Sequence, residues 1–356
     1  MIASLRKFIS ESLGIIINKV IAGLIIAFVL IMLSFSLSGL LFTGQLAPYF
    51  SQGVGIFLMS TAIGLVVMGI LAHQYHIIPA MQSSLILIIA SMTSGIAITT
   101  GKDLIATTLV LLPLTALIVG IIYFIFGQFR FVRFIRYVPY PVIGGFLAGN
   151  GVSLIIGALQ LMTPFELTLN SVANLFLIDS LVVWLPALAM ATLLFFALRQ
   201  SQRYTVIPIV LILGVGAIYG IIYVQGQSIA NAITQGILLG DIGSLQYELL
   251  YTLNPDLIDW RAIQSQWANI LAVVMVAVIH LSLNLTGIEL IKQDDFDIDE
   301  QVRSNGIMNI AIALAGGNVG FSSASTTTMN YRVGGKSRLT YVICGGAILT
   351  VIYFGS

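Results

Sequence analysis

The chain of 356 residues is 58% hydrophobic and only 8% charged, and its mean hydropathy is +1.03. No soluble core could bury this much apolar surface, so the composition predicts an integral membrane protein in contact with the lipid bilayer. The formal net charge of +1 gives nucleic acid no basic surface to bind. The single cysteine, Cys344, excludes an internal disulfide and a cysteine-based metal cluster.

Apolar runs long enough to cross a bilayer recur along the chain. With about 20 apolar residues per crossing, they predict an all-α, polytopic transmembrane fold of about eleven segments. The expected crossings are 20–42, 52–72, 78–99, 104–126, 141–162, 180–198, 206–224, 268–291, a shorter broken pair within 305–332, and 339–355. The first run is too long for a cleavable signal peptide and continues as a spanning segment.

The basic residues are distributed unevenly between the two sides of this predicted topology. With the N-terminus inside, the outer loops keep only Lys102 and Arg261, and every other Lys and Arg falls inside. This bias predicts a cytoplasmic N-terminus and a multi-pass plasma-membrane protein. The basic, aromatic stretch Phe129–Tyr140 is expected to lie in the cytoplasmic interface. The one long polar loop, 225–267, is then an extracellular linker between two halves.

The stretch Gly316–Gly335 is small and hydroxylated although it lies between apolar segments. It predicts a broken membrane helix, because non-helical backbone survives in hydrocarbon only inside protein or beside a wet cavity. A helix that restarts near Phe321 would point free N–H groups and a positive dipole end into that cavity. His76–Ser84 has the same pattern, and paired interrupted segments are typical of a transporter site. The alternative is that these small residues only let helices pack closely.

Glu289 is an ionisable side chain at the inner end of the crossing 268–291, and Thr286 lies three residues before it on the same helix face. A carboxylate at membrane depth is costly and is a candidate for function. It would suit proton coupling if half-buried, or would stay ionised beside a sodium ion. The alternative is an ion pair with Lys292. His280 is either a hydrogen-bonded core residue or part of the coupling site.

Neither a metal site nor an enzyme motif is evident. The acidic run Gln293–Gln301 superficially resembles a calcium loop, but its Gly and terminal Glu are misplaced, so a solvated loop is expected there. There is no HExxH, no Walker loop and no Gly-x-Ser-x-Gly elbow. We therefore expect no enzyme activity, no catalytic residue, no bound metal and no resident cofactor.

Four motifs follow one another in the order found in a known family. They are Arg136–Gly149 (RYVPYPVIGGFLAG), Asn284–Asp294 (NLTGIELIKQD), Asn305–Asn309 (NGIMN) and Ser322–Arg338, which ends in GGKSR. Together they resemble the fifth, eighth, ninth and tenth helices of the SulP sulfate permease family. The resemblance covers most of the chain, and the ordered set is more specific than any one motif.

The resemblance implies a seven-plus-seven inverted-repeat transporter fold in which a core domain moves against a gate domain. The first repeat would be 1–224, the linker 225–267, and 268–356 an incomplete second repeat. The chain would then contain about 11 of the 14 segments. A bacterial inner-membrane location and a homodimer are compatible with it. The family would continue with three further segments and a STAS domain, so we expect this sequence to be truncated.

The resemblance also implies where the substrate and the coupling ion bind. An anion would lie between the third and tenth half-helices, on substrate-binding residues of the two helix starts: Gln82, Ser83, Ser323, Ser325 and Thr326. Ion coupling would map to the eighth helix, at Ser282, Thr286 and Glu289.

One departure from the family pattern concerns charge. Many members carry an arginine directly after the serine of the tenth helix, whereas here Thr326 follows Ser325. Anion affinity must then rest on helix dipoles and hydroxyls, each worth about 0.3–2 kcal/mol.

The function expected from the resemblance is secondary active transport of a small inorganic or organic anion by alternating access. Sulfate or bicarbonate is the expected substrate, in symport or exchange, with Na⁺ or H⁺ as the coupling ion. Two alternatives stay open: a proton-coupled nucleobase carrier of the same fold, in which Glu289 would contact the base, and a non-transporting membrane anion sensor or scaffold.

Overall fold

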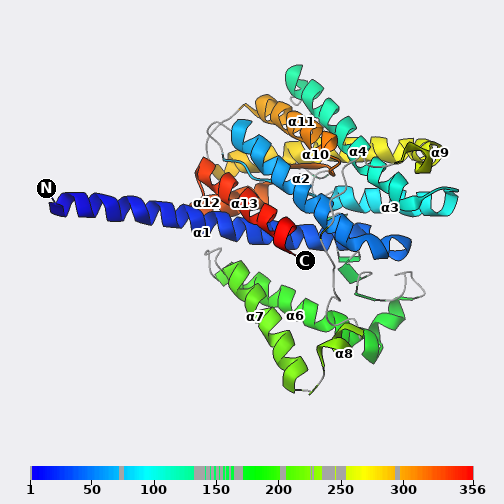
Figure 1. Cartoon of the computed structure of the whole chain (residues 1–356), viewed down its shortest axis with the longest axis horizontal. Helices are drawn as coiled ribbons and strands as arrows, with labels where there is room; N and C mark the ends of the chain where they lie inside the picture. The colour runs from blue at the N-terminus through cyan, green and yellow to red at the C-terminus, as the bar shows by residue number, and fades with distance from the viewer. Residues whose placement is uncertain are drawn as a thin grey trace. The chain divides into compact units, whose positions relative to one another are not determined.

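The computed structural model describes residues 2–71, 76–131, 171–200, 206–224, 228–234, 254–292 and 297–355, with isolated positions between 141 and 163 and at 226 and 245. Side chains are described from Lys19 onward. The helices and strands of this part of the chain are α1 Ile2–Leu41, α2 Phe50–Leu71, β1 Pro79–Met81, α3 Ser83–Thr99, α4 Leu104–Gln128, α6 Ile178–Gln200, α7 Val206–Val224, α8 Ile229–Thr234, α9 Trp260–Ser265, α10 Trp267–Lys292, α11 Ile298–Leu314, β2 Gly320–Ser322, α12 Ala324–Arg332 and α13 Arg338–Phe354 (Figure 1). Short 3₁₀ turns occur at Gly44–Tyr49, Val172–Phe176 and Pro255–Leu257.

Five helices of the described residues are long and apolar enough to cross a membrane. They are Lys19–Leu41, Gly44–Leu71, Leu104–Gln128, Ser180–Ala197 and Trp267–Glu289. Shorter apolar helices are Ser83–Thr99, Ile212–Val224 and Arg338–Phe354. The all-α, polytopic membrane fold predicted from the sequence is confirmed. The predicted crossing at 141–162 and most of the basic stretch after Phe131 lie outside the described residues.

The chain divides into two compact units. One unit comprises Met1–Leu147 together with Ser244–Ser356, and the other comprises Ala148–Gly243. The first unit therefore draws helices from both ends of the chain, with α13 packed against α1 and α2. The division into repeats at 1–224, 225–267 and 268–356, which the resemblance implies, stays a prediction.

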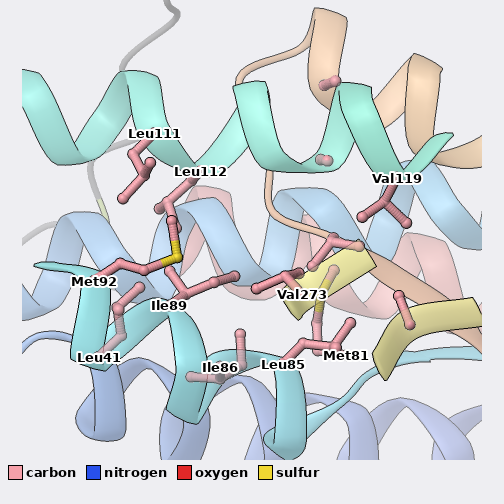
Figure 2. Close-up of a cluster of buried hydrophobic side chains, with 14 of the residues drawn as sticks. Leu41, Met81, Leu85, Ile86, Ile89, Met92, Leu111, Leu112, Val119 and Val273 are labelled. Atoms are coloured by element: carbon pink, nitrogen blue, oxygen red, sulfur yellow. The ribbon is translucent and has the colours of Figure 1, made fainter. Parts of the chain in front are cut away.

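The apolar core of the first unit surrounds α3. Figure 2 shows Leu85, Ile86, Ile89 and Met92 of this helix projecting toward α4 and α10. Leu111 and Leu112 of α4 and Val273 of α10 meet them. All seven side chains are 0% exposed. The buried face of α3 thus fixes the position of the helix whose start forms half of the site.

Helices α4 and α11 approach each other backbone to backbone. A Cβ added at Gly306 of α11 would lie 2.5 Å from the backbone nitrogen of Phe124, and one at Gly127 of α4 would lie 2.5 Å from the Arg303 nitrogen. A Cβ at Gly120 would lie 2.8 Å from the Ile310 nitrogen. Only glycine fits at these positions, so α4 and α11 form one closely packed pair.

The two interrupted segments meet as an antiparallel pair of strands. Pro79 lies opposite Ser322, Ala80 opposite Phe321, and Met81 opposite Gly320. Gly316, with a φ of +82°, follows the end of α11 and turns the chain toward β2. The expectation that the second helix restarts near Phe321 was wrong by a few residues. Phe321 is paired in β2 and α12 begins at Ala324, because strand pairing satisfies backbone groups that would otherwise be left unbonded inside the membrane.

Candidate functional site

The starts of α3 and α12 lie next to each other because each follows one of the paired strands. Gln82 is the N-cap residue of α3 and Ser323 is the N-cap residue of α12. The Ser323 N–H donates to the Ile78 carbonyl at 3.1 Å, which continues the strand pairing up to the helix start. The structure therefore brings together the two sets of residues that the sequence predicts for substrate binding.

Accessibility separates the side chains at these two starts. Gln82 and Ser83 are half-buried and Ser325 is exposed, whereas Ser323 and Thr326 are buried. Within the described part of the chain, no hydrogen bond engages the side chains of Gln82 and Ser83. The Ser325 hydroxyl lies 3.0 Å from that of Ser323. Gln82, Ser83 and Ser325 are thus the predicted site residues best placed to meet a ligand.

The buried hydroxyls of α12 bind the chain ahead of β1. The Thr326 hydroxyl donates to the Ile78 carbonyl at 3.3 Å, and the Thr327 hydroxyl accepts the Ile78 N–H at 3.0 Å. The Tyr341 hydroxyl of α13 donates to the Ile77 carbonyl at 2.8 Å. Thr326, predicted as a substrate contact, therefore has a structural role in holding the two interrupted segments together.

Helix α10 contacts both half-helix starts from one face. Its His280 Nδ1 lies 2.8 Å from the Ser84 hydroxyl in the first turn of α3. Its Asn284 Oδ1 accepts the N–H of Ala324, the first residue of α12, at 2.8 Å. Gly287, one turn further on, faces the same residue, since a Cβ there would lie 3.6 Å from the Ala324 Cβ. His280 is consequently a buried, hydrogen-bonded residue that also touches the site.

The residues predicted for ion coupling lie on a different face of α10. At about 100° per residue, Ser282, Thr286 and Glu289 lie about 200°, 240° and 180° round the helix from His280. The Ser282 hydroxyl donates to the carbonyl of Val278 in its own helix at 2.8 Å. Thr286 is exposed and Glu289 is half-buried. These three side chains therefore lie on the side of α10 away from His280 and Asn284, and their role in coupling stays a prediction.

Asparagines of α11 bind the backbone of β2, a role that the sequence does not reveal. Asn305 and Asn309, both 0% exposed, lie one turn apart and hydrogen-bond with Ser322 and Gly320. Their four-residue spacing on an apolar helix was visible in the NGIMN motif. The sequence did not show which residues they bind, because β2 is placed by pairing with β1, more than 230 positions earlier in the chain.

The site holds helix dipoles and hydroxyls rather than fixed charge. None of the residues described at the two helix starts, Gln82–Ser84 and Ser322–Thr327, is basic or acidic. Among the described residues there is also no group of three or more His, Cys, Asp or Glu that could hold a metal ion. The acidic run before α11 serves in part as a helix cap, since the Asp297 carboxylate accepts the N–H groups of Asp299 and Glu300. An arrangement of this kind can bind a small anion through oriented N–H and O–H donors.

The fold and the site together define a multi-pass membrane protein with two interrupted helices whose starts meet. A family model described as the sulfate permease family matches residues 16–356. The chain belongs to this family, as the four motifs predicted.

Individual relatives are more distant. The putative sulfate transporter YbaR of Bacillus subtilis (strain 168) is 25% identical over 115 residues, which are 32% of this chain and 24% of that protein. The transmembrane domain of the cyanobacterial bicarbonate transporter BicA has a similar structure, with a TM-score of 0.67 and 18% identity over 94% of this chain and 81% of that one. The structure of SLC26A9 gives a TM-score of 0.69 with 16% identity over 96% of this chain.

The coverage of these relatives is partial. The chain spans 54% of the SLC26A9 chain, and the alignment with YbaR spans about a quarter of that protein, 24%. The structural likenesses show a shared membrane fold.

Proposed function

We propose that the protein is a secondary transporter that carries a small inorganic anion across the membrane by alternating access, with the anion held between the starts of α3 and α12. The observation that carries this proposal is the pairing of Pro79 with Ser322, which sets the two helix N-termini side by side inside one compact unit. Accessible polar groups at both starts, from Ser83 and Ser325, are then available to the same ligand.

The physical basis is the positive end of each helix. Each helix N-terminus stabilises a negative charge by about 0.3–1 kcal/mol at an exposed site and by up to about 2 kcal/mol when partly buried. Two such ends, with hydroxyl donors, favour an anion but give only modest affinity. Since no lysine or arginine lies among the described residues of the two starts, we expect weak binding and rapid release, which suit a carrier.

The names of the relatives support sulfate or bicarbonate as the substrate. YbaR is described as a putative sulfate transporter, BicA as a bicarbonate transporter, and murine Slc26a9 as an anion transporter. Both anions are small, and their oxygens are hydrogen-bond acceptors, which match the N–H and O–H donors of the site.

Coupling, orientation and assembly belong to the same proposal. We assign coupling to Na⁺ or H⁺ and to the face of α10 that carries Ser282, Thr286 and Glu289, where the half-buried carboxylate is the titratable group. The uneven distribution of Lys and Arg supports a cytoplasmic N-terminus. A bacterial inner membrane is the proposed location. A homodimer is the proposed assembly.

Uptake of labelled anions tests the proposal. The protein is reconstituted in proteoliposomes, and entry of ³⁵S-sulfate and ¹⁴C-bicarbonate is measured under an imposed sodium or proton gradient, with protein-free liposomes as the control. Saturable uptake of one of the two anions is expected. Absence of uptake for both anions, together with uptake of labelled uracil or xanthine, would indicate a nucleobase carrier. Anion binding without flux would indicate a sensor. Either result would contradict the proposal.

A further inference from the structure

The outer edge of β2 is bonded to side chains instead of to another strand. Phe321 is paired with Ala80 of β1, whereas the N–H groups of Gly320 and Ser322 donate to asparagine side chains of α11. The sheet has only two strands among the described residues. An unpaired strand edge is especially costly at membrane depth because no water is available to replace the missing strand.

Asn309 binds Gly320 through both ends of its amide. Its Oδ1 accepts the Gly320 N–H at 3.0 Å, and its Nδ2 donates to the Gly320 carbonyl at 2.7 Å. The same Nδ2 also donates to the carbonyl of Asn305 at 2.8 Å. The side chain therefore reproduces the paired donor and acceptor that a neighbouring strand would offer.

Asn305 binds Ser322 one helical turn earlier, through the backbone N–H and the side-chain hydroxyl instead of the backbone N–H and carbonyl. Its Oδ1 accepts the Ser322 N–H at 2.8 Å, and its Nδ2 donates to the Ser322 hydroxyl at 2.9 Å. Ser322 is followed directly by Ser323, the N-cap residue of α12. The two asparagines thus hold the last residues of the chain before the half-helix begins.

The helix that carries these asparagines is itself fixed. Gly306, the residue after Asn305, packs against the backbone of α4 at a distance that no other residue allows. The α4 side chain Tyr123 packs edge-on against Phe321 of β2, with ring centroids 6.5 Å apart. Strand β2 is therefore held between α11 and β1 by hydrogen bonds and touches α4 through an aromatic contact.

We propose that Asn305 and Asn309 are positioning residues that act in place of a third strand and fix the start of α12 against the closely packed α4–α11 pair. The consequence for anion binding rests on the proposed function. The two amides orient the α12 start without touching the anion, and each one protects a different backbone N–H group.

Native-state hydrogen exchange of the full chain in detergent tests the positioning at single residues. In the unaltered protein, the Gly320 and Ser322 N–H groups should exchange as slowly as that of Phe321, which faces β1. Asn309→Leu should accelerate exchange at Gly320 by roughly tenfold or more, with a smaller effect at Ser322. Asn305→Leu should do the reverse.

Thr115→Val is the matched control, since it removes a buried hydroxyl of α4 that bonds only to its own helix, to the Leu111 carbonyl at 2.8 Å. It should leave exchange at both strand positions unchanged. Equal acceleration at Gly320 and Ser322 in both asparagine variants, or fast exchange at both positions in the unaltered protein, would overturn the proposal. Exchange in the unaltered protein needs no variant, so it still tests the proposal if the variants do not fold.

Sulfate and bicarbonate affinities of the same proteins separate this proposal from the proposed function. Weaker anion binding in Asn305→Leu and Asn309→Leu, with unchanged binding in Thr115→Val, is expected. An unaltered protein that binds neither anion would contradict the proposed function, and the exchange pattern would still decide the role of the asparagines. If the asparagine variants show the expected exchange pattern but bind the anion as tightly as the unaltered protein, the claim that Asn305 and Asn309 position the anion site would be overturned.

Discussion

The Ser84 hydroxyl of α3 lies 2.8 Å from Nδ1 of His280 on α10. One turn further along α10, Asn284 accepts the N–H of Ala324 at the start of α12, also at 2.8 Å. A single helix therefore holds the starts of both interrupted helices through two side chains on one face. A change in the position of α10 would reach both halves of the proposed anion site together.

The first prediction concerns the bond between Ser84 and His280. Ser84→Ala and His280→Ala should each lower the free energy of unfolding by about 1–3 kcal/mol, because each removes one partner of a buried hydrogen bond. The two effects should be coupled by about 0.5 kcal/mol or more in a double-mutant cycle.

The control for this cycle is Ser91→Ala, the same change about two turns along α3. The Ser91 hydroxyl bonds to the Ile88 carbonyl of its own helix and is exposed. Its effect should add to that of His280→Ala without coupling. Additive effects of Ser84→Ala and His280→Ala, measured by denaturant unfolding in detergent, would show that the bond does not contribute.

The second prediction concerns charge at the exposed start of α12. Ser325→Asp places a carboxylate where the anion is proposed to bind, so repulsion should raise the Kd for sulfate by about tenfold or more. Ser325→Asn, which adds similar volume without charge, should have a smaller effect. Equilibrium binding of ³⁵S-sulfate measures both variants, and thermal unfolding verifies that they are folded. Equal Kd values for the two variants would place the anion elsewhere.

The third prediction concerns the glycine contacts between α4 and α11. Gly306→Ala should destabilise the protein by about 1–3 kcal/mol or more, because its Cβ would meet the backbone of Phe124 at 2.5 Å. Gly345→Ala in α13 is the matched control, since a Cβ there has no neighbour within 4 Å among the described residues. It should be neutral or stabilising by up to about 1 kcal/mol, as alanine favours a helix. Similar unfolding temperatures for the two variants would be evidence against the close packing.

The fourth prediction concerns pH and the carboxyl group of Asp259, which precedes α9 outside the spanning segments. The backbone N–H of Ala262 lowers the pKa of this carboxyl below 3.8, its ordinary value, with further bonds from Thr100, Gly101 and Arg261. The carboxylate therefore stabilises the folded protein above its unfolded pKa, and this contribution is lost as the pH falls through the lower folded value.

Unfolding temperatures between pH 7 and pH 3, which span the ordinary pKa of about 4, should show this loss directly. The unfolding temperature of Asp259→Asn should be lower than that of the unaltered protein at neutral pH, and the difference between the two temperatures should shrink toward the acid end of the range. A difference that stays constant with pH would mean that ionisation of Asp259 does not contribute.

Local patterns in the sequence were sufficient to predict most of the helices and the two interrupted segments, and the family resemblance supplied the residues at the two helix starts. Gln82 and Ser323 were expected to open half-helices, and both are N-cap residues. Short polar runs after a breaker indicate that a helix starts nearby because capping depends on neighbouring residues, but they leave the first helical residue uncertain by a few positions.

Contacts between distant residues could not be predicted in the same way. The pairing of Ala80 with Phe321 depends on the whole fold, and three-residue strands leave no periodic signal. For the same reason the facing side of α10 was not identified: nothing local distinguishes His280 and Asn284 from Ser282 and Thr286. The helix start expected near Phe321 was wrong for the same reason, because Phe321 is paired in β2 and α12 begins at Ala324.

Protection of single cysteines by the anion tests the central claim most directly. Cys344, buried in α13, is first replaced by alanine, and a cysteine is then introduced at Ser83, Ser325 or, as a control at the far end of α3, Thr99. Modification by a charged methanethiosulfonate reagent is followed with and without sulfate or bicarbonate. We predict that one of these anions slows modification at both Ser83 and Ser325 and leaves Thr99 unaffected. Unchanged rates at Ser83 and Ser325 in the presence of an anion that the protein transports would contradict a site between the two helix starts.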